Sequence, residues 1–316
     1  MSTLELSKRI HMVGIGGVGL SAIARVLAAR GHVVTGSDLR ASSTTQALNA
    51  LGIETYVGHA EPQVGEAEML VVSSAIPEDN VEIRAAKEKG IPVLKRRSLL
   101  PALMQGSQGV AVAGTHGKTT TASMITVVLK QACLDPTFIV GGIIADLGTN
   151  AQAGQGDHFV IEADEYDRMF HGLRPHIAVV TNVEMDHPDC YHDIVDMQDA
   201  FGGVDTKGNI VACADSGALE AVLREHEEEM ADIVTYGTSP EADYVVRGVT
   251  TNGRGGVDCT VWRKGEEWQA LSLAVPGRHN ALNATAALIV SQLCGVERGK
   301  AAKALAEFTG VLRRFE

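Results

Sequence analysis

Short aliphatic runs alternate along the chain with segments whose apolar residues recur every three or four positions. In the first hundred residues, aliphatic runs predict buried strands at 9–16, 32–38, 54–58, 69–75 and 91–96. The intervening segments at 20–31, 44–52 and 81–90 predict helices, each ending on a glycine of the type that closes a helix. Because strand and helix alternate strictly, we expect an α/β domain whose parallel sheet is covered by helices on both faces.

A second α/β series begins after the polar stretch 105–108. Further strands are predicted by the aliphatic runs at 109–115, 157–164, 176–183 and 208–215, with helices between them. Residues 242–275 change to a two-residue alternation around Asn252-Gly253, which predicts an antiparallel hairpin. Two helices are expected at 280–295 and 299–310, and no element after them. These patterns predict one domain at 1–106 and a second, with a small antiparallel β flap, at 107–316.

Composition narrows the class of partner. The chain has 316 residues, and its 27 Lys and Arg against 39 Asp and Glu give a formal net charge of −12. With no basic block, a nucleic acid is not an expected partner. The 5 cysteines are scattered without a C-x-x-C pair, which favours reduced thiols in the cytoplasm. No apolar stretch reaches the ~18 residues of a membrane span, and the glycine-rich segment 8–24 fits a turn better than an export signal.

The first glycine-rich turn joins the first predicted strand to the first predicted helix. Gly14, Gly16 and Gly19 form the pattern G-x-G-x-x-G, with Gly17 inside it. Such a turn lets backbone N–H groups approach a diphosphate at the start of a helix. Asp38 ends the second strand about 20 residues later, where a carboxylate commonly meets a ribose hydroxyl. The pattern predicts a Rossmann-like site for a dinucleotide or a nucleotide-sugar diphosphate; the alternative is a tight turn that uses glycine only for packing.

The second glycine-rich turn is a shortened phosphate loop. A standard loop needs glycine at position 112, where Val112 stands, and what remains is Gly114, Thr115, His116, Gly117, Lys118 and Thr119. Lys118 is suited to bridge the β- and γ-phosphates of a nucleotide, and the Thr119 hydroxyl is suited to bind Mg²⁺. A helix that begins near Thr120 directs its positive end at the same place. We expect a P-loop-type α/β domain, the alternative being a surface turn with an incidental lysine.

Acidic and polar residues follow the next two predicted strands. The first cluster is Glu162, Asp164, Glu165 and Asp167, and the second is Asn182, Glu184, Asp186 and His187. The carboxyl ends of neighbouring parallel strands meet at one edge of a sheet, so we expect the clusters to face each other. Crowded carboxylates repel unless a cation lies among them, and Glu162 is the best candidate metal ligand because it is nearest the end of the apolar run. His187 is a candidate metal or substrate ligand, against the alternatives of solvated loop acids and a packed histidine.

Seven stretches, in this order and spacing, resemble the ATP-dependent Mur ligases. They are VGIGGVGLSAIA, SSAIP, AGTHGKTTT, EADEYD, TNVEMDH, GRHNALNATAA and RRFE. The resemblance spans nearly the whole chain, and a shortened phosphate loop joined to H-N-x-x-N is specific to this superfamily. It implies that the first turn holds UDP-N-acetylmuramic acid and the second holds ATP with Mg²⁺. The implied reaction converts the lactyl carboxylate of the sugar to an acyl phosphate, which the amine of an amino acid then attacks.

The resemblance also implies roles for individual residues. Lys118 would bridge the β- and γ-phosphates, Thr119 with Glu162 would hold one Mg²⁺, and His187 would hold a second. Further residues implied at the ATP site are Gly114, Thr115, His116, Gly117, Thr120, His279, Asn280, Asn283 and Arg314. The residues implied at the sugar-nucleotide site are Gly14, Gly16, Gly17, Gly19, Asp38, Ser73 and Ser74. Simple helix capping is the alternative role for Asn280.

Three questions stay open at this point. Within the family the sequence favours the alanine-adding enzymes, although Tyr166 stands where they more often have serine and EADEYD is similar to the ligase that attaches murein tripeptide. The family has a third, C-terminal domain that contacts the amino acid, and no counterpart follows Glu316, so little or no turnover is expected of this chain. One rival class is a non-catalytic nucleotide-sugar or dinucleotide-binding module. Another is an NAD-dependent oxidoreductase, but that function would leave the second glycine-rich turn unexplained.

Overall fold

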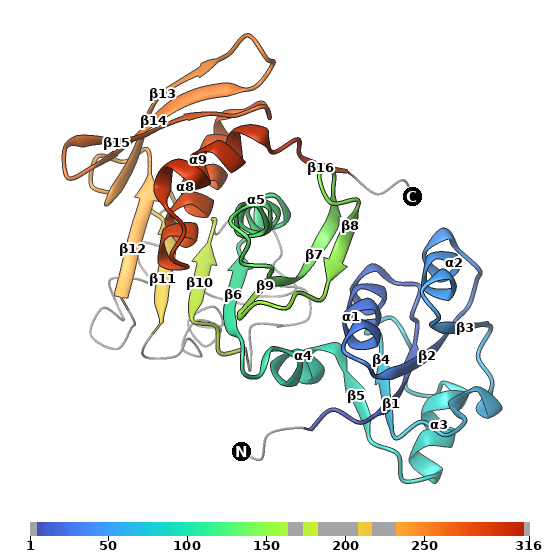
Figure 1. The fold of residues 1–316 in the computed structure, drawn as a ribbon. Coiled ribbons are helices and arrows are strands. Elements are labelled where there is room, and N and C mark those ends of the chain that lie inside the picture. The colour runs from blue at the N-terminus through green and yellow to red at the C-terminus, as the bar shows by residue number, and fades with distance from the viewer. Residues whose placement is uncertain (1–4, 164–172, 183–207, 217–231, 313–316) are drawn as a thin grey trace. The chain divides into compact units, whose positions relative to one another are not determined.

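The computed structural model of the chain describes residues 5–163, 173–182, 208–216 and 232–312 (Figure 1). It divides into two compact units. The first comprises Met1–Gln105 together with Ala151–Ala153, and the second comprises Gly106–Asn150 and Gly154–Glu316. Within the described residues, no helix combines the length and the apolar composition that a bilayer span requires.

The first unit is built on a five-stranded parallel sheet with the strand order β3-β2-β1-β4-β5. Its strands are β1 (Arg9–Val13), β2 (Val33–Asp38), β3 (Glu54–Val57), β4 (Met69–Val72) and β5 (Val93–Lys95). Its helices are α1 (Val18–Ala29), α2 (Ser43–Ala50), the short 3₁₀ helix η1 (Glu61–Val64), α3 (Val81–Glu88) and α4 (Arg96–Met104). The predicted strands are all present, and parallel pairing of β1 with β2 and β4 confirms the α/β fold.

The helices of the first unit cover the sheet as the sequence predicts (Figure 1). Alternate residues of a strand point to opposite faces, and Val13 of β1 packs with Leu70 of β4 and Ile83 of α3 in one apolar cluster. The three predicted helix-closing glycines, Gly31, Gly52 and Gly90, all have positive φ, at 86°, 81° and 71°. This confirms where α1, α2 and α3 end, because glycine adopts the left-handed conformation without a steric cost.

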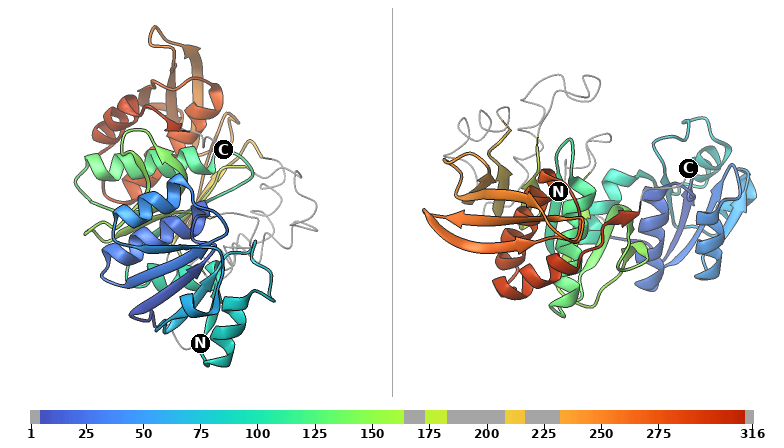
Figure 2. Two further views of the ribbon diagram at one scale, coloured as in Figure 1. Left: turned by 90° about the vertical axis from the view of Figure 1, so that its right-hand side faces the viewer. Right: turned by 90° about the horizontal axis from the view of Figure 1, so that it is seen from above.

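The second unit is built on an eleven-stranded mixed sheet (Figure 2). The order is β15-β14-β13-β12-β11-β10-β6-β9-β7-β16, with β8 beside β7. The parallel strands are β6 (Gln108–Ala113), β7 (Thr137–Ile144), β9 (His158–Glu162), β10 (Ile177–Val180), β11 (Asn209–Cys213) and β12 (Asp232–Gly237). The antiparallel flap is β13 (Tyr244–Thr251), β14 (Val257–Arg263) and β15 (Glu266–Ser272).

Three helices pack together against the second sheet: α5 (Lys118–Gln131), α8 (Arg278–Leu293) and α9 (Arg298–Glu307). Their buried aliphatic residues and those of the parallel strands form one core cluster. Nine residues of α5 and eleven of α8 are buried, which is why neither helix shows a strongly one-sided pattern in the sequence. Packing in this core therefore holds α5 in place immediately after the loop that follows β6.

Several elements differ from the sequence-based expectation. Helix α4 was not among the predicted helices. It contains Pro101, which is unfavourable inside a helix, and its buried leucines Leu99, Leu100 and Leu103 hold it against the first sheet. Strands β7, β12 and β8 (Thr149–Gln152) were also missed, and the last described residues form a two-residue strand, β16 (Val311–Leu312), paired with β7.

The hairpin between β13 and β14 is real, but its connection is longer than a two-residue Asn-Gly turn. The Asn252 side chain organises it by accepting hydrogen bonds from the N–H groups of Arg254 and Gly256, each at 3.0 Å. Asn252 therefore shapes this loop through the hydrogen bonds of its side chain and not through its own backbone conformation.

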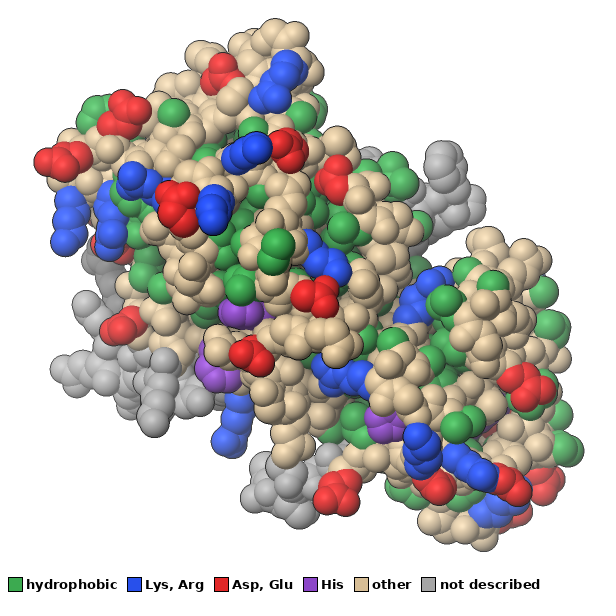
Figure 3. Space-filling model, viewed as in Figure 1, with side chains coloured by type: hydrophobic (Ala, Val, Ile, Leu, Met, Phe, Trp, Pro, Cys, Tyr) green, Lys and Arg blue, Asp and Glu red, His purple; other side chains and the backbone are tan. Residues whose placement is uncertain are grey.

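Acidic and basic side chains are interspersed on the face of each unit shown in Figure 3. No basic patch gathers on that view, in agreement with the acidic composition. Positive charge for an anionic ligand must therefore come from individual residues and from helix ends.

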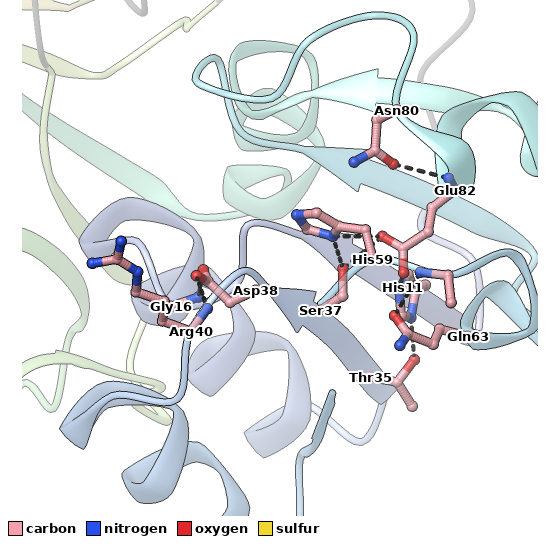
Figure 4. A network of polar contacts seen from close by, with 11 residues as sticks. His11, Gly16, Thr35, Ser37, Asp38, Arg40, His59, Gln63, Asn80 and Glu82 are labelled. Atoms are coloured by element: carbon pink, nitrogen blue, oxygen red, sulfur yellow. Dashed lines mark hydrogen bonds and ion pairs between the residues drawn. The ribbon is translucent and has the colours of Figure 1, made fainter. Parts of the chain in front are cut away.

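A buried polar network lies between α3 and the sheet of the first unit (Figure 4). The Glu82 carboxylate is fully buried; the Ser37 hydroxyl donates to its Oε2 at 2.6 Å, and His59 Nδ1 lies 3.2 Å from the same oxygen. His11 Nε2 lies 3.6 Å from Oε1. Burial raises the pKa of Glu82, but the contacts from His11 and Ser37 and the charges of both histidines outweigh burial and hold it below the usual value.

Replacing Glu82 with glutamine is expected to destabilise the first unit at neutral pH by about 3 kcal/mol, because the buried charge that accepts from Ser37 and contacts His11 and His59 is lost. A depressed carboxyl pKa stabilises the fold above the unfolded-state pKa and ceases to do so as pH falls through the folded-state value. The difference between parent and Glu82→Gln should therefore shrink as the pH is lowered below the usual range of glutamate.

Urea unfolding and hydrogen exchange of peptides from residues 9–38 measure this effect in the first unit. The matched control is Glu88→Gln, an exposed position on the same helix α3, where a change within about 0.5 kcal/mol is expected. Equal stability of Glu82→Gln and the parent at neutral pH would contradict the assignment of a stabilising buried charge.

Candidate active site

The second glycine-rich turn connects β6 to α5 and has no room for side chains at two positions. Gly114 has φ +126°, and a Cβ there would lie 2.3 Å from Thr181 Oγ1 and 2.7 Å from the Asn182 carbonyl oxygen. Gly117 has φ +82°, and its Cβ would lie 2.7 Å from Asn283 Oδ1. Both glycines are thus required by conformation and by space. The turn is narrow because β10 and α8 approach it from two sides.

The end of β10 holds this turn through hydrogen bonds to its backbone. Asn182 accepts from two consecutive N–H groups, with its carbonyl oxygen 2.9 Å from Thr115 N and its Oδ1 2.7 Å from His116 N. The Thr181 hydroxyl donates to the His116 carbonyl oxygen at 2.5 Å and to that of Ala113 at 3.1 Å. Asn182 was a sequence-based candidate for the site. Thr181 was not singled out, although it begins the stretch TNVEMDH and follows a central parallel strand.

Lys118 is the first residue of α5, and its ammonium is folded back into the turn. Nζ donates to the Gly114 carbonyl oxygen at 2.5 Å and to that of Thr115 at 3.1 Å. Gly117 is the N-cap of α5, and the first N–H groups of a helix have no partner within it. The turn therefore gathers a lysine charge and a positive helix end, the combination that suits the phosphates of a nucleotide.

Thr119 and Glu162 form a second polar pair beside the turn. The Thr119 hydroxyl donates to Glu162 Oε1 at 2.9 Å, and Gly141 N donates to Oε2 at 2.5 Å. The pair supplies two hard oxygen atoms next to a phosphate-binding turn, and this donor set fits Mg²⁺, which keeps several waters and phosphate oxygens as ligands. The described residues contain no group of three or more metal-ligating side chains. We therefore expect a nucleotide to complete the metal's coordination.

Several candidate residues lie outside the described part of the chain. These are Asp164, Glu165, Tyr166, Asp167, Glu184, Asp186, His187 and Arg314. Their predicted roles, including a second metal ligand at His187, stay predictions.

The start of α8 brings the H-N-x-x-N motif to the same turn. Gly277 is the N-cap, so Asn280 does not cap the helix, and that alternative is wrong. Instead Asn280 Nδ2 donates to the Pro276 carbonyl oxygen at 2.7 Å, and Asn283 Nδ2 donates to Asn280 Oδ1 at 3.2 Å. Both asparagines are buried. The amide oxygen of Asn283 in turn lies next to Gly117 in the turn.

Two cavities flank the turn. The first, of about 400 Å³, is lined by His116, Gly117, Thr181, Asn182, Cys213, Asp215, Ser216, Tyr236, His279, Leu282 and Asn283. The second, of about 540 Å³, is lined by Thr119, Thr120, Gly141, Gly142, Val275, Pro276, His279, Asn280, Phe308, Gly310, Val311 and Leu312. Burial raises the pKa of Cys213 to about 11, so this thiol is a neutral wall residue of the first cavity and not a nucleophile.

Asp215, at the first cavity, was not a sequence-based candidate. Its carboxylate accepts from Thr238 N at 2.7 Å and from Ser239 N at 3.0 Å, so it fixes the segment that follows β12. We interpret Asp215 as a structural residue of the cavity wall.

The first glycine-rich turn lies at the carboxyl edge of the first sheet. Gly14 has φ +83°, and its Cβ would lie 3.0 Å from Ser73 Cβ at the end of β4. Asp38 Oδ2 accepts from Gly16 N at 2.9 Å (Figure 4). The predicted residues Gly14, Gly16, Asp38 and Ser73 are therefore brought together, and Ser74 is the exposed residue after Ser73. In this structure Asp38 braces the turn itself, and a contact with ribose stays a prediction.

Comparison with known proteins agrees with this geometry. The Mur ligase family catalytic-domain model matches residues 9–108, and the Mur ligase middle-domain model matches residues 112–291. Over 316 residues the chain is 44% identical to UDP-N-acetylmuramate–L-alanine ligase of Laribacter hongkongensis (strain HLHK9), covering 98% of this chain and 67% of that protein. It is 46% identical over 320 residues to the protein of the same name from Arthrobacter sp. (strain FB24), covering 99% and 67%.

Solved structures show the same fold. UDP-N-acetylmuramate-alanine ligase from Thermotoga maritima superimposes with a TM-score of 0.84 at 31% identity, over 97% of this chain and 70% of that one. UDP-N-acetylmuramate:L-alanyl-gamma-D-glutamyl-meso-diaminopimelate ligase from Neisseria meningitides gives 0.87 at 29%, over 98% and 100%. The chain spans about two thirds of the length of the two curated relatives named above. With both family models matched and relatives above 40% identity, the chain belongs to the Mur ligase family.

Proposed function

We propose that this chain carries the sugar-nucleotide and ATP sites of a ligase that joins L-alanine to the carboxylate of UDP-N-acetylmuramic acid. The observation that carries the proposal is the meeting of Lys118, Thr119, Glu162 and Asn283 around one glycine turn. Relatives at 44% and 46% identity bear the name of that ligase. Their names also support a role in the synthesis of peptidoglycan precursors.

The residues of the second turn suit the first half of the proposed reaction. An oxygen of the sugar's lactyl carboxylate attacks the γ-phosphorus of ATP, and the bond from that phosphorus to the β,γ-bridging oxygen breaks to release ADP. Lys118 and the N–H groups at the start of α5 would hold the phosphates in line and offset their charge. Mg²⁺ bound by Thr119 and Glu162 would supply further charge neutralisation on the phosphates.

In the second half, the amine of the amino acid attacks the carbonyl carbon of the acyl phosphate. The carbon–oxygen bond to phosphate breaks, inorganic phosphate leaves, and the amine loses its proton as the amide forms. Water would hydrolyse the acyl phosphate, so the site must exclude it until the amine arrives. We expect the nucleotide to occupy the cavities beside the turn, where the buried Asn280 and Asn283 would offer their amides to the adenine ring.

Attachment of murein tripeptide is the second candidate reaction. The Neisseria meningitides structure bears the name of a ligase for L-alanyl-gamma-D-glutamyl-meso-diaminopimelate and superimposes as well as the alanine ligase does. Backbone similarity therefore does not separate the two acceptors. The higher sequence identity to the alanine ligases favours L-alanine.

A competition assay tests the acceptor. Because little or no turnover is expected of residues 1–316 alone, a form extended past Glu316 is supplied with ATP, Mg²⁺, UDP-N-acetylmuramic acid and equal concentrations of L-alanine and murein tripeptide, and mass spectrometry identifies the product. Calorimetry with UDP-N-acetylmuramic acid and with ATP–Mg²⁺ is run in parallel, since binding is a property of these two units. Exclusive tripeptide product would replace the alanine proposal, and absence of heat with both ligands would refute the ligase proposal altogether.

Lys118→Met is expected to weaken ATP binding about tenfold or more, because the ammonium that meets the phosphates is lost. Binding of UDP-N-acetylmuramic acid should not change, since that ligand belongs to the other turn. Lys130→Met, at the far end of α5 where Lys130 pairs with Asp135 at 2.8 Å, is the matched control. Unaltered ATP affinity in Lys118→Met would support the non-catalytic binding module instead.

Gly117→Ala tests the contact between the turn and α8. The new methyl group would collide with Asn283 Oδ1, so we expect ATP affinity to fall about tenfold, alongside a stability loss of about 1–2 kcal/mol from positive φ. Gly148→Ala is the control, because Gly148 has φ +66° with open space around it. It should lose stability but bind ATP normally; similar ATP affinity in both variants would show that Asn283 does not shape the turn.

A further inference from the structure

Arg96 has no role in the sequence analysis, yet its side chain lies against the first glycine-rich turn. It is the first residue of α4 and follows β5 directly, so its backbone stands at the carboxyl edge of the first sheet. A Cβ built on Gly19 would lie 2.2 Å from Arg96 Nη1, 3.2 Å from Cζ and 3.3 Å from Cδ. Because β4 separates β5 from β1 in the sheet, the side chain extends past the end of β4 to reach α1.

This contact changes the interpretation of Gly19. The third glycine of G-x-G-x-x-G usually permits close packing of the helix on a strand. Here Gly19 lies inside α1, without a positive φ, so its backbone conformation suits any residue. What fills the space of the missing side chain is the guanidinium of Arg96. The absence of a side chain at Gly19 therefore leaves open the space that the arginine occupies.

The guanidinium lies where positive charge is already concentrated. α1 begins at Val18 after its N-cap Gly17, and its first turn contains no acidic residue. A helix start carries a partial positive charge, and a cation beside it is unfavourable unless an anion joins them. Within the part of the chain that the structure describes, Arg96 makes no hydrogen bond and no ion pair. The nearby Asp38 carboxylate is directed to Gly16 N instead.

We infer that Arg96 binds the diphosphate of the sugar nucleotide, in the space that Gly19 leaves open. The inference rests on the proposed function, because it takes the first turn as the sugar-nucleotide site. A guanidinium presents parallel N–H donors that match two phosphate oxygens, which a lysine ammonium does not. It supplies the side-chain cation that a Rossmann-like turn of glycines lacks. It contacts phosphate alone and leaves base and sugar to other residues.

Calorimetry with UDP tests this role in Arg96→Met, which keeps the length of the side-chain stem. Loss of a charge-assisted contact should weaken UDP binding about 10- to 100-fold. Uridine, which has no phosphate, should bind parent and variant alike in an NMR titration. Arg96→Lys should fall between, since it keeps the charge without the planar fork. The matched control is Arg97→Met, the exposed neighbour on α4, which should bind UDP as the parent does.

A double-mutant cycle tests the pairing of Arg96 with Gly19. Gly19→Ala should push the guanidinium aside and weaken UDP binding in the parent, but add little in the Arg96→Met background. Equal losses in both backgrounds would show that Gly19 acts independently and would overturn the pairing. Circular dichroism and thermal unfolding confirm that each variant is folded.

The outcomes separate the inference from the proposed function. If the parent binds UDP and folded Arg96→Met binds it equally well, the inference is wrong and the proposed function stands. If the parent binds no UDP, both are wrong, because the first turn is then not a sugar-nucleotide site. ATP affinity should be the same in parent and Arg96→Met, since ATP belongs to the second turn; a matching loss of ATP binding would also overturn the assignment.

Discussion

In the second unit, the end of β10, the helix α8 and Lys118 of α5 all crowd the four-residue turn from Gly114 to Gly117. Gly114 lies against the end of β10, Gly117 lies against α8, and Lys118 is folded back onto the turn's own carbonyl oxygens. No side chain larger than hydrogen fits at either glycine. Because the turn cannot spread, the lysine charge, the start of α5 and the Thr119–Glu162 pair stay within reach of one phosphate chain.

The two glycine-rich turns solve the same electrostatic problem with different parts. In a chain of net charge −12, neither site draws on a general positive field. The second turn carries its lysine within its own sequence, at the position after Gly117. The first turn has no basic residue of its own, and the guanidinium that lies against Gly19 comes from α4, far along the chain. The difference explains why one turn is recognisable as an anion site from a short motif and the other is not.

Local sequence patterns predicted the parts of this structure that are local. Strand and helix alternation, the glycines that close helices and both glycine turns depend on neighbouring residues, and each was found where expected. Helix α4 was not predicted; it contains Pro101, whose unfavourable effect on a helix is outweighed by buried leucines that only the fold brings into contact. The contacts of Thr181 with His116, and of Arg96 with Gly19, join residues distant in sequence, so no spacing rule reveals them. Site residues outside the described chain, such as His187, stay predictions.

The two-residue strand β16 adds a mechanical connection to the catalytic region. Val311 pairs with Ile144 of β7, and its side chain fills the space over Gly142, which also lies next to Thr119 and the Leu312 carbonyl oxygen. Gly141, the preceding residue of β7, donates its N–H to Glu162. Residues 311–312 thus pair with the same strand that donates to the proposed magnesium carboxylate. The position of β16 on β7 and the position of the Glu162 carboxylate are therefore both set by the backbone of residues 141–144.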